Sequence, residues 1–297
     1  WVNKTGVQVV TTFACSNAFP QEHPQYLGMI GAAGHPSAHD FVENEADFIL
    51  AVGTQLRAMN RATLEHALAR KTLAVINVAT DALDSALKAD HVISLGAQAA
   101  MQTLLELQAI KPLHWNTITP DLRCQSLEEE ALGADVAEEN GAGVRLHAAV
   151  VQLQAYLPRF RHLLFDAGNC ATAAAHYLRM PAPMSTTIAL GMGGMGYAIA
   201  GAVGAQLGET AGRTLVLGGD GAFLMTGLEM HTAVDLQLPI LWVVFNNNQH
   251  GMCVTRQQLY FDGRIEGNRY TQVNIAQIAR GIGGPSQLWC RSVTRLS

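Results

Sequence analysis

The stretch from residue 214 to residue 252 constrains the fold most. It contains two apolar runs joined by an amphipathic segment, and a polar cluster follows each run: Gly219-Asp220-Gly221 after the first and Asn246-Asn247-Asn248 after the second. In a parallel α/β sheet, consecutive strands end at one edge, and that edge binds ligands. We therefore expect Asp220 and the asparagine run to meet. Carboxylate and carboxamide oxygens beside glycines suit Mg²⁺ held against a diphosphate, because Mg²⁺ takes one or two carboxylates plus phosphate oxygens.

The composition favours a compact α/β enzyme over other classes. Of 297 residues, 49% are hydrophobic, 14% are charged and 28 are glycine, which is typical of such enzymes. The net charge is −5, without the basic, aromatic-interleaved surface that nucleic acid binding requires. No apolar run approaches the roughly 20 residues that span a bilayer, so we expect neither nucleic acid nor membrane as a partner. The five cysteines are scattered without CxxC spacing, which favours a reducing, cytoplasmic location.

The alternation of short β-branched runs with helical stretches predicts an α/β fold with two doubly wound parallel-sheet domains. We expect a central α/β domain at residues 1–111, a linker at 112–143 and a second domain at 144–297. Prolines and acidic runs interrupt the pattern in the linker. The predicted strands are residues 7–12, 48–53, 72–78, 91–95, 163–166, 186–190, 214–219, 238–245 and 288–293. The predicted helices of the second domain include residues 144–157, stopped by Pro158, the small-residue segment 197–207, and 274–280.

A glycine motif leaves a different enzyme class open. Residues 191–196 read Gly-Met-Gly-Gly-Met-Gly, a GxGxxG pattern after a strand and before a helix, and Asp220 follows about two dozen residues later. This spacing alone is typical of a nicotinamide-dependent dehydrogenase, and glycines that only permit tight packing are a further alternative. The glycines on both sides of Asp220 favour a metal over a ribose hydroxyl. The asparagine run has no role in a nicotinamide site.

Gly219-Asp220-Gly221, followed after 24 residues by Asn246-Asn247, resembles the GDG…NN motif of thiamine-diphosphate-dependent enzymes. Surrounding segments are similar to the acetolactate synthase and pyruvate oxidase branch of that family. These segments are residues 168–170, 193–196 and 246–252 in the second domain, and residues 19–31 and 46–54 in the first.

The resemblance implies thiamine diphosphate and Mg²⁺ as cofactors. The metal ligands would be Asp220, the Asn247 side chain and the backbone carbonyl of Gln249. The amides of Gly221 and Ala222 would receive the diphosphate at a helix amino end. Met195 would hold the cofactor in a bent conformation, in which the amine of the cofactor itself helps to form the reactive ylid. The other residues expected to contact the cofactor are Gly193, which would bond the aminopyrimidine, Asn169 and Cys170, which form a diphosphate-contacting turn, and Gly219, His250, Gly251 and Met252.

Three histidines and an arginine have two interpretations each. His250 follows the metal loop and would exchange a proton with the donor carbonyl, or serve only the structure. Arg256 falls where acetohydroxyacid synthases carry a tryptophan, and it would bind a substrate carboxylate or lie on the surface. His35 and His39 are four residues apart, the spacing of metal ligands on a helix, but Gly34 and Pro36 favour a loop role.

The implied activity is that of a lyase or transferase that decarboxylates a 2-oxo acid, with pyruvate as the expected donor, and joins the acyl-anion equivalent to an acceptor (carboligation). The dehydrogenase and a non-catalytic, cofactor-binding remnant remain alternatives. The family's essential glutamate lies on a pyrimidine-binding domain, which we expect to be supplied by a missing segment or a partner subunit. We therefore expect the 297-residue chain alone to be inactive, and the whole protein to be a homodimer or homotetramer. The sequence leaves FAD binding in the central domain open.

Overall fold

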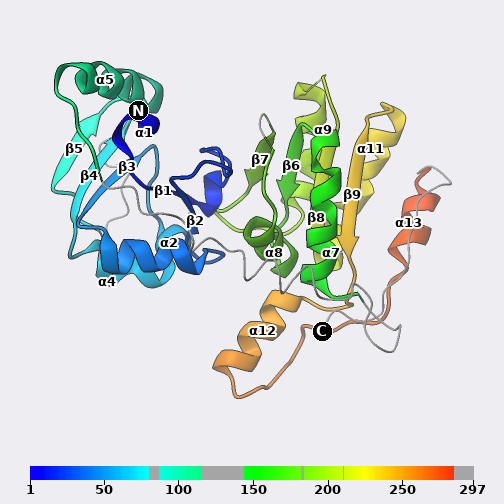
Figure 1. The fold of residues 1–297 in the computed structure, drawn as a ribbon. Helices are drawn as coiled ribbons and strands as arrows, with labels where there is room; N and C mark the ends of the chain where they lie inside the picture. Colours follow the sequence, from blue (N-terminus) through cyan, green and yellow to red (C-terminus); the bar gives the residue numbers. More distant parts are fainter. Residues whose placement is uncertain (80–86, 116–143, 182–183, 210, 284–297) are drawn as a thin grey trace. The chain divides into compact units, whose positions relative to one another are not determined.

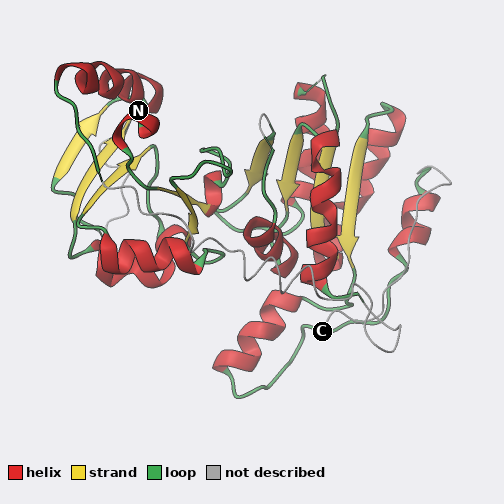
Figure 2. Cartoon of the chain, viewed as in Figure 1, coloured by secondary structure: helices red, strands yellow, loops and turns green. Residues whose placement is uncertain are grey.

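The computed structural model describes residues 1–79, 87–115, 144–181, 184–209 and 211–283, and the chain divides into two units, residues 1–126 and 127–297. All pairings between named strands are parallel, and helices lie between the strands along the chain (Figures 1 and 2). The predicted α/β class with parallel sheets is therefore confirmed. The strand predicted at 288–293 and most of the predicted linker lie outside the described residues.

The first unit holds two small sheets. β1 (Val9–Thr12) pairs with β2 (Tyr26–Ile30), while β3 (Phe48–Val52), β4 (Thr72–Asn77) and β5 (His91–Ser94) form a second sheet in the order β3-β4-β5. The sequence pattern does not predict β2, because no helical periodicity separates it from β1. The helical segments of this unit are α1 (Val2–Thr5), η1 (Phe13–Cys15), α2 (Pro36–Asp40), the π-helix η2 (Phe41–Glu45), α3 (Ala58–Arg61), η3 (Ala62–Leu64), α4 (Glu65–Leu68) and α5 (Ala97–Ile110).

His35 and His39 hold the turn between β2 and α2. His35 Nδ1 accepts a hydrogen bond from the Met29 N–H at 2.8 Å, and His39 Nε2 accepts one from the Gly31 N–H at 3.0 Å. The loop prediction is wrong for His39, because Pro36 begins α2 at its first position, where proline is tolerated, instead of breaking it. Burial lowers the pKa of His39, which favours the neutral ring that accepts this bond.

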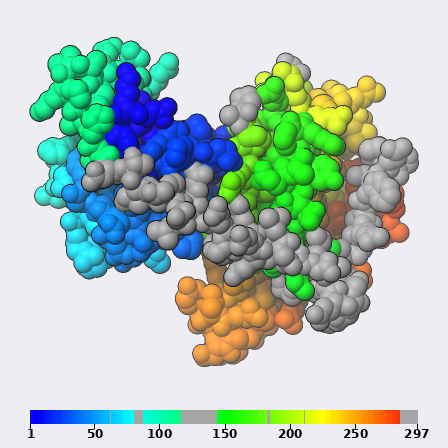
Figure 3. All heavy atoms as spheres, in the orientation of Figure 1, coloured from blue at the N-terminus to red at the C-terminus, as the bar shows by residue number. Residues whose placement is uncertain are grey.

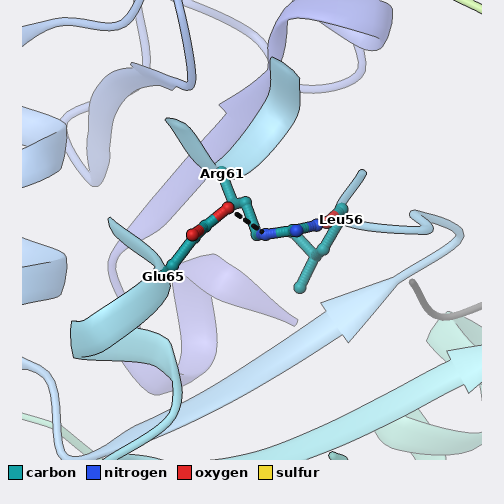
Figure 4. Close-up of polar contacts among 3 residues, drawn as sticks. All are labelled: Leu56, Arg61 and Glu65. Atoms are coloured by element: carbon teal, nitrogen blue, oxygen red, sulfur yellow. Dashed lines mark hydrogen bonds and ion pairs between the residues drawn. The ribbon is translucent and has the colours of Figure 1, made fainter. Parts of the chain in front are cut away.

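A buried arginine fixes the turn after β3 (Figure 4). Leu56 has a φ of 45°, which is uncommon for a residue other than glycine. Arg61 donates from Nη1 to the Leu56 carbonyl at 2.8 Å and from Nε to Glu65 Oε1 at 3.0 Å. The guanidinium thus satisfies the carbonyl of the left-handed residue and is itself neutralised by a carboxylate.

The second unit is built on one four-stranded sheet in the order β7-β6-β8-β9 (Figure 1). Its strands are β6 (His162–Phe165), β7 (Ser185–Ile188), β8 (Thr214–Gly219) and β9 (Ile240–Phe245). The chain adds β7 on one side of β6 and then crosses to β8 on the other, so the strand order reverses between β6 and β8. The helical segments are α7 (Leu146–Leu153), η4 (Gln154–Arg159), α8 (Asn169–Tyr177), α9 (Tyr197–Gly208), α10 (Asp220–Thr226), η5 (Gly227–Glu229), α11 (Met230–Asp235), α12 (Gly251–Tyr260) and α13 (Ile275–Gly281).

Side chains of β6 and β8 are buried on both faces of this sheet. Leu164 and Val216 pack with α9 in one hydrophobic cluster, whereas their neighbours in sequence face the other way, as strand geometry requires. The small-residue helix α9 lies close to the sheet, since a Cβ added at Gly201 would come within 3.8 Å of Leu164. Gly204, by contrast, has open space around it.

The helix predicted at residues 144–157 is shorter than expected. α7 ends at Leu153, and the chain continues as the 3₁₀ segment η4, which contains Pro158. The Gln154 side chain makes two hydrogen bonds of 2.8 Å to the backbone of Arg179. This tether gives the residues before Pro158 a different helical geometry.

Candidate cofactor and metal site

Asp220 lies at the carboxyl edge of the four-stranded sheet of the second unit, beside the point where the strand order reverses. It is the first residue of α10, directly after β8, and is only 2% exposed. Its Oδ2 accepts hydrogen bonds from the N–H groups of Asn247, at 3.1 Å, and of Asn248, while Oδ1 accepts one from the Gly221 N–H at 2.9 Å. The ends of β8 and β9 therefore meet, as parallel pairing requires.

The three asparagines after β9 have different surroundings. Asn246 donates from Nδ2 to the Val273 carbonyl at 2.9 Å, and Asn248 Oδ1 accepts from the Val273 N–H at 3.0 Å. Asn248 also takes a left-handed conformation, with a φ of 54°, which asparagine tolerates. Within the described residues, the Asn247 side chain makes no hydrogen bond. Two asparagines thus shape the loop, and the carboxamide between them is left for a ligand.

A segment that the sequence analysis does not identify clamps this loop. Residues 268–270 run antiparallel to residues 248–250, with an isolated bridge between Gln249 and Arg269. The bridge is closed by His250 N–H to the Asn268 carbonyl at 2.8 Å and by Tyr270 N–H to the Asn248 carbonyl at 3.1 Å. Since these bonds use the neighbours of Gln249, its own carbonyl has no hydrogen-bond donor among the described residues.

Several other predicted residues gather around the loop. A Cβ added to Gly251 would lie 3.2 Å from Asn247 Nδ2 and 3.6 Å from Asn169 Nδ2. A Cβ added to Gly221 would lie 2.6 Å from His250 Nδ1 and 3.8 Å from Met195 Sδ. The structure therefore brings residues from four segments together. Members of this group are Asn169, Met195, Asp220, Gly221, Asn247, His250 and Gly251.

Cys170 lies at the start of α8, next to Asn169. Its side chain is buried, and burial, together with the charges of the Asp166 and Asp220 carboxylates, raises the pKa of the thiol to about 12. The thiol is therefore neutral at physiological pH. A neutral thiol neither attracts nor repels a diphosphate by charge.

Asp166 is a site residue that the sequence analysis does not identify. It follows β6, is 1% exposed, and accepts hydrogen bonds from the N–H groups of Gly196 and Ala198, both at 2.8 Å, and of Ile199 at 3.3 Å. Burial raises its pKa, against the lowering effect of these N–H donors. The carboxylate satisfies the amino end of α9, which lacks a capping side chain of its own. It thereby fixes the turn that carries Met195.

Two buried polar atoms beside Asp220 have no hydrogen-bond partner. They are His250 Nδ1 and the Tyr270 hydroxyl, and their rings pack edge to face with centroids 5.4 Å apart. Burial, followed by the charge of the nearby Asp220 carboxylate, raises the pKa of Tyr270 above its usual range. Buried polar atoms are nearly always paired, so this pair indicates a place for a bound group.

The remaining predicted residues do not join the group. Gly193 has a φ of 70° and nothing within 4 Å of an added Cβ. Arg256 is exposed on α12 and takes part in no ion pair of the described residues. The far end of that helix, shown in orange in Figure 3, is also exposed, as at Tyr260, which is 76% accessible. Ala222 is buried in the cluster that includes residues of α9. Gly219 ends β8 directly before Asp220, and Met252 follows the asparagine loop at the start of α12.

The donor set fits an oxygen-seeking cation. The buried Asp220 carboxylate has only backbone N–H donors and no cationic side chain among its described partners. Its three N–H bonds leave part of its acceptor capacity, since a carboxylate has about four lone-pair sites. Asn247 and the Gln249 carbonyl add neutral oxygens. One carboxylate with amide oxygens is a donor set for Mg²⁺, which takes its other ligands from phosphate and water. No group of three histidine, cysteine or acidic side chains suited to a metal occurs in the described residues.

The helices of the described residues give no sign of a membrane span. None of them combines the length and the apolar character that crossing a bilayer takes.

Comparison with known proteins identifies both parts of the chain. Residues 166–295 match the family model of the thiamine pyrophosphate enzyme C-terminal TPP binding domain, and residues 1–107 match that of the thiamine pyrophosphate enzyme central domain. The structure places Asp166, Asp220 and the asparagine loop within the first of these matches.

The chain is similar to enzymes of about twice its length. It is 26% identical over 302 residues to the sulfoacetaldehyde acetyltransferase of Castellaniella defragrans, covering 94% of this chain and 50% of that protein. It is 28% identical over 268 residues to the acetolactate synthase isozyme 2 large subunit of Escherichia coli, covering 90% and 47%. It is 23% identical over 278 residues to the probable acetolactate synthase large subunit of Methanocaldococcus jannaschii, covering 91% and 45%. The chain thus spans about half the length of the relatives it matches.

The two family matches occupy separate stretches in the order central domain, cofactor domain, and together they cover most of the chain. The resemblance that rests on the GDG…NN spacing is therefore confirmed. The chain belongs to the thiamine-pyrophosphate-dependent enzymes, in their acetolactate synthase-like branch.

Proposed function

We propose that this chain forms the diphosphate- and metal-binding part of a Mg²⁺-dependent enzyme that decarboxylates a 2-oxo acid and transfers the acyl unit to an acceptor. We propose pyruvate as the donor, because relatives include acetolactate synthases and an acetyltransferase. One observation carries the metal assignment. The buried Asp220 carboxylate, without a cationic partner among the described residues, lies against a loop that leaves the Asn247 carboxamide and the Gln249 carbonyl unbonded.

Each side chain of the site has a proposed role. Asp220, Asn247 and Gln249 hold the cation, and Asn169 lies beside Asn247, where the diphosphate is expected. Met195 supports the bent cofactor, and Asp166 fixes the turn on which Met195 stands. When bound, thiamine diphosphate supplies the carbon nucleophile that attacks the oxo group.

We also propose which backbone amides bind the diphosphate and which side chains contact the substrate. The Gly221 N–H is used by Asp220 in this structure, so the diphosphate would have to compete for this donor. His250 offers its unpartnered Nδ1 as the atom that holds or releases a proton. Arg256, exposed on α12, is the proposed contact for a substrate carboxylate.

The geometry disfavours the nicotinamide dehydrogenase. In that interpretation, the acid after the second strand receives a ribose hydroxyl. Here Asp220 is bonded to the N–H groups of the 246–248 loop, and the loop has no function in a nicotinamide site. We therefore do not propose this activity.

Substitution of the metal ligands tests the proposal. Asn247→Ala removes a side chain that makes no hydrogen bond among the described residues, so we expect the fold to persist and the Mg²⁺-dependent affinity for thiamine diphosphate to fall. The loss should exceed the roughly 10–100-fold that substitution of a ligand's outer partner costs. Asp220→Asn keeps the shape of the carboxylate and removes its charge, so it should have the larger effect.

Titration calorimetry of the whole protein, with and without Mg²⁺, measures both effects. Asp235→Asn is the matched control, because Asp235 is 64% exposed and pairs only with His231 among the described residues. Wild-type affinity in both Asp220→Asn and Asn247→Ala would overturn the metal assignment.

A further inference from the structure

Tyr270 is one of the second-unit residues with a buried polar atom that has no hydrogen-bond partner, in its case the hydroxyl. Leaving a buried hydroxyl unpaired is costly, and phenylalanine would fill the same space without that cost. The hydroxyl thus has no use in the structure as it stands. Tyrosine at this position needs a reason that the unbound fold does not supply.

The backbone contacts of Tyr270 place it beside the metal loop. Its N–H donates to the Asn248 carbonyl at 3.1 Å, and the N–H of the same Asn248 donates to Asp220 Oδ2. A single residue therefore links Tyr270 to the carboxylate.

The ring of Tyr270 has a second fixed contact. It packs edge to face on His250, with centroids 5.4 Å apart, and His250 in turn lies against Gly221, next to Asp220. The ring is thus held between the loop backbone and the histidine. Its hydroxyl is positioned by two contacts that do not depend on any hydrogen bond of its own.

We propose that Tyr270 is a positioning residue of the cation site, whose hydroxyl donates a hydrogen bond to the Asp220 carboxylate when the carboxylate turns to its metal. Asp220 accepts three backbone N–H bonds in this structure. Turning towards a cation weakens some of them, and the tyrosine hydroxyl replaces what is lost. The inference rests on the proposed function, since it requires Asp220 to be a metal ligand.

Tyr270→Phe tests the role, because it removes the hydroxyl and keeps the ring on His250. We expect the affinity for Mg²⁺, and for Mn²⁺ as a spectroscopic probe, to fall about 10-fold or more in the presence of thiamine diphosphate, as for other partners of metal ligands. The thermal unfolding midpoint without ligand should stay the same or rise, because an unpaired buried hydroxyl has been deleted. A purely structural tyrosine would not separate these two quantities.

The control is Tyr260→Phe, on an exposed tyrosine of α12, which should leave both measurements unchanged. Free Mn²⁺, followed by electron paramagnetic resonance in the whole protein, gives the metal affinity without an activity assay. If the wild type and Tyr260→Phe bind the metal, and Tyr270→Phe binds it equally well, the inference is overturned. If the wild type itself binds no metal with the cofactor, the proposed function fails instead.

Discussion

At the scale of single residues, Gly221 is restricted to glycine by the ring of His250. An added Cβ would lie 2.6 Å from Nδ1 and 3.1 Å from Cε1 of that ring. We expect Gly221→Ala to push the histidine away, lower the unfolding free energy by about 1–3 kcal/mol, as overpacking does, and weaken cofactor binding. Denaturant titration and calorimetry measure the two effects.

Gly204→Ala provides the matched comparison. Gly204 lies inside α9, and an added Cβ would meet nothing within 4 Å, so alanine should stabilise the helix by up to about 1 kcal/mol. Its cofactor affinity should equal that of the wild type. Equal effects of the two substitutions would contradict the role given to the Gly221–His250 contact.

The residues of the metal loop show what a sequence can and cannot predict at this scale. The position of Asp220 and the asparagine run at strand ends follows from apolar periodicity and parallel pairing. Which asparagine is left for a ligand does not follow from periodicity, because it depends on hydrogen bonds that Asn246 donates to Val273 and that Asn248 accepts from Val273, 25 or more residues away. The family resemblance indicates Asn247, and the geometry gives the physical reason.

At the scale of elements, α9 depends on a carboxylate from another strand. Asp166 satisfies three N–H groups at its amino end. Asp166→Asn keeps the size of the side chain but turns an NH₂ group or a weaker acceptor towards these donors. We expect a loss of about 1–3 kcal/mol in unfolding free energy, the cost of buried unsatisfied donors, measured by chemical denaturation.

The same substitution should also weaken cofactor binding. Asp166 accepts a hydrogen bond from the N–H of Gly196, the residue directly after Met195, and thereby holds Met195 in place. Asp235→Asn, on an aspartate that is 64% exposed, is the control and should change neither quantity. Unchanged stability of Asp166→Asn would show that the amino end of α9 is satisfied in another way.

Irregular elements are where sequence reasoning is weakest. The segment 266–273, which clamps the metal loop, has neither helical nor strand periodicity, and it is held by backbone bonds and by bonds from side chains such as Gln257, which accepts from the Glu266 N–H at 3.2 Å. Periodic patterns report burial on one face of a regular element. They carry no information about such long-range pairings. Strand β2 is missed for a related reason, because no helical crossover separates it from β1.

At the scale of the whole molecule, the site occupies one unit. Asp166, Asp220, the asparagine loop and Tyr270 all lie in residues 127–297, and the matched TPP binding domain covers them. A ligand that binds only the native state stabilises the structure it contacts, by about 2.7 kcal/mol at a concentration of 100 times Kd. Cofactor binding should therefore protect the second unit directly.

We accordingly expect that thiamine diphosphate and Mg²⁺ slow amide hydrogen exchange in residues 246–250 and 268–273, and leave β3, β4 and β5 of the first unit unchanged. The 297-residue chain alone should release no CO₂ from pyruvate, because the resemblance places the essential glutamate on a pyrimidine-binding domain, and the two matched domains are the central and the C-terminal one. Exchange mass spectrometry and a CO₂ assay check the two parts. Asn247→Ala is the control that should abolish the protection. Measurable decarboxylation by this chain would show that the carboxylate for the aminopyrimidine comes from within it.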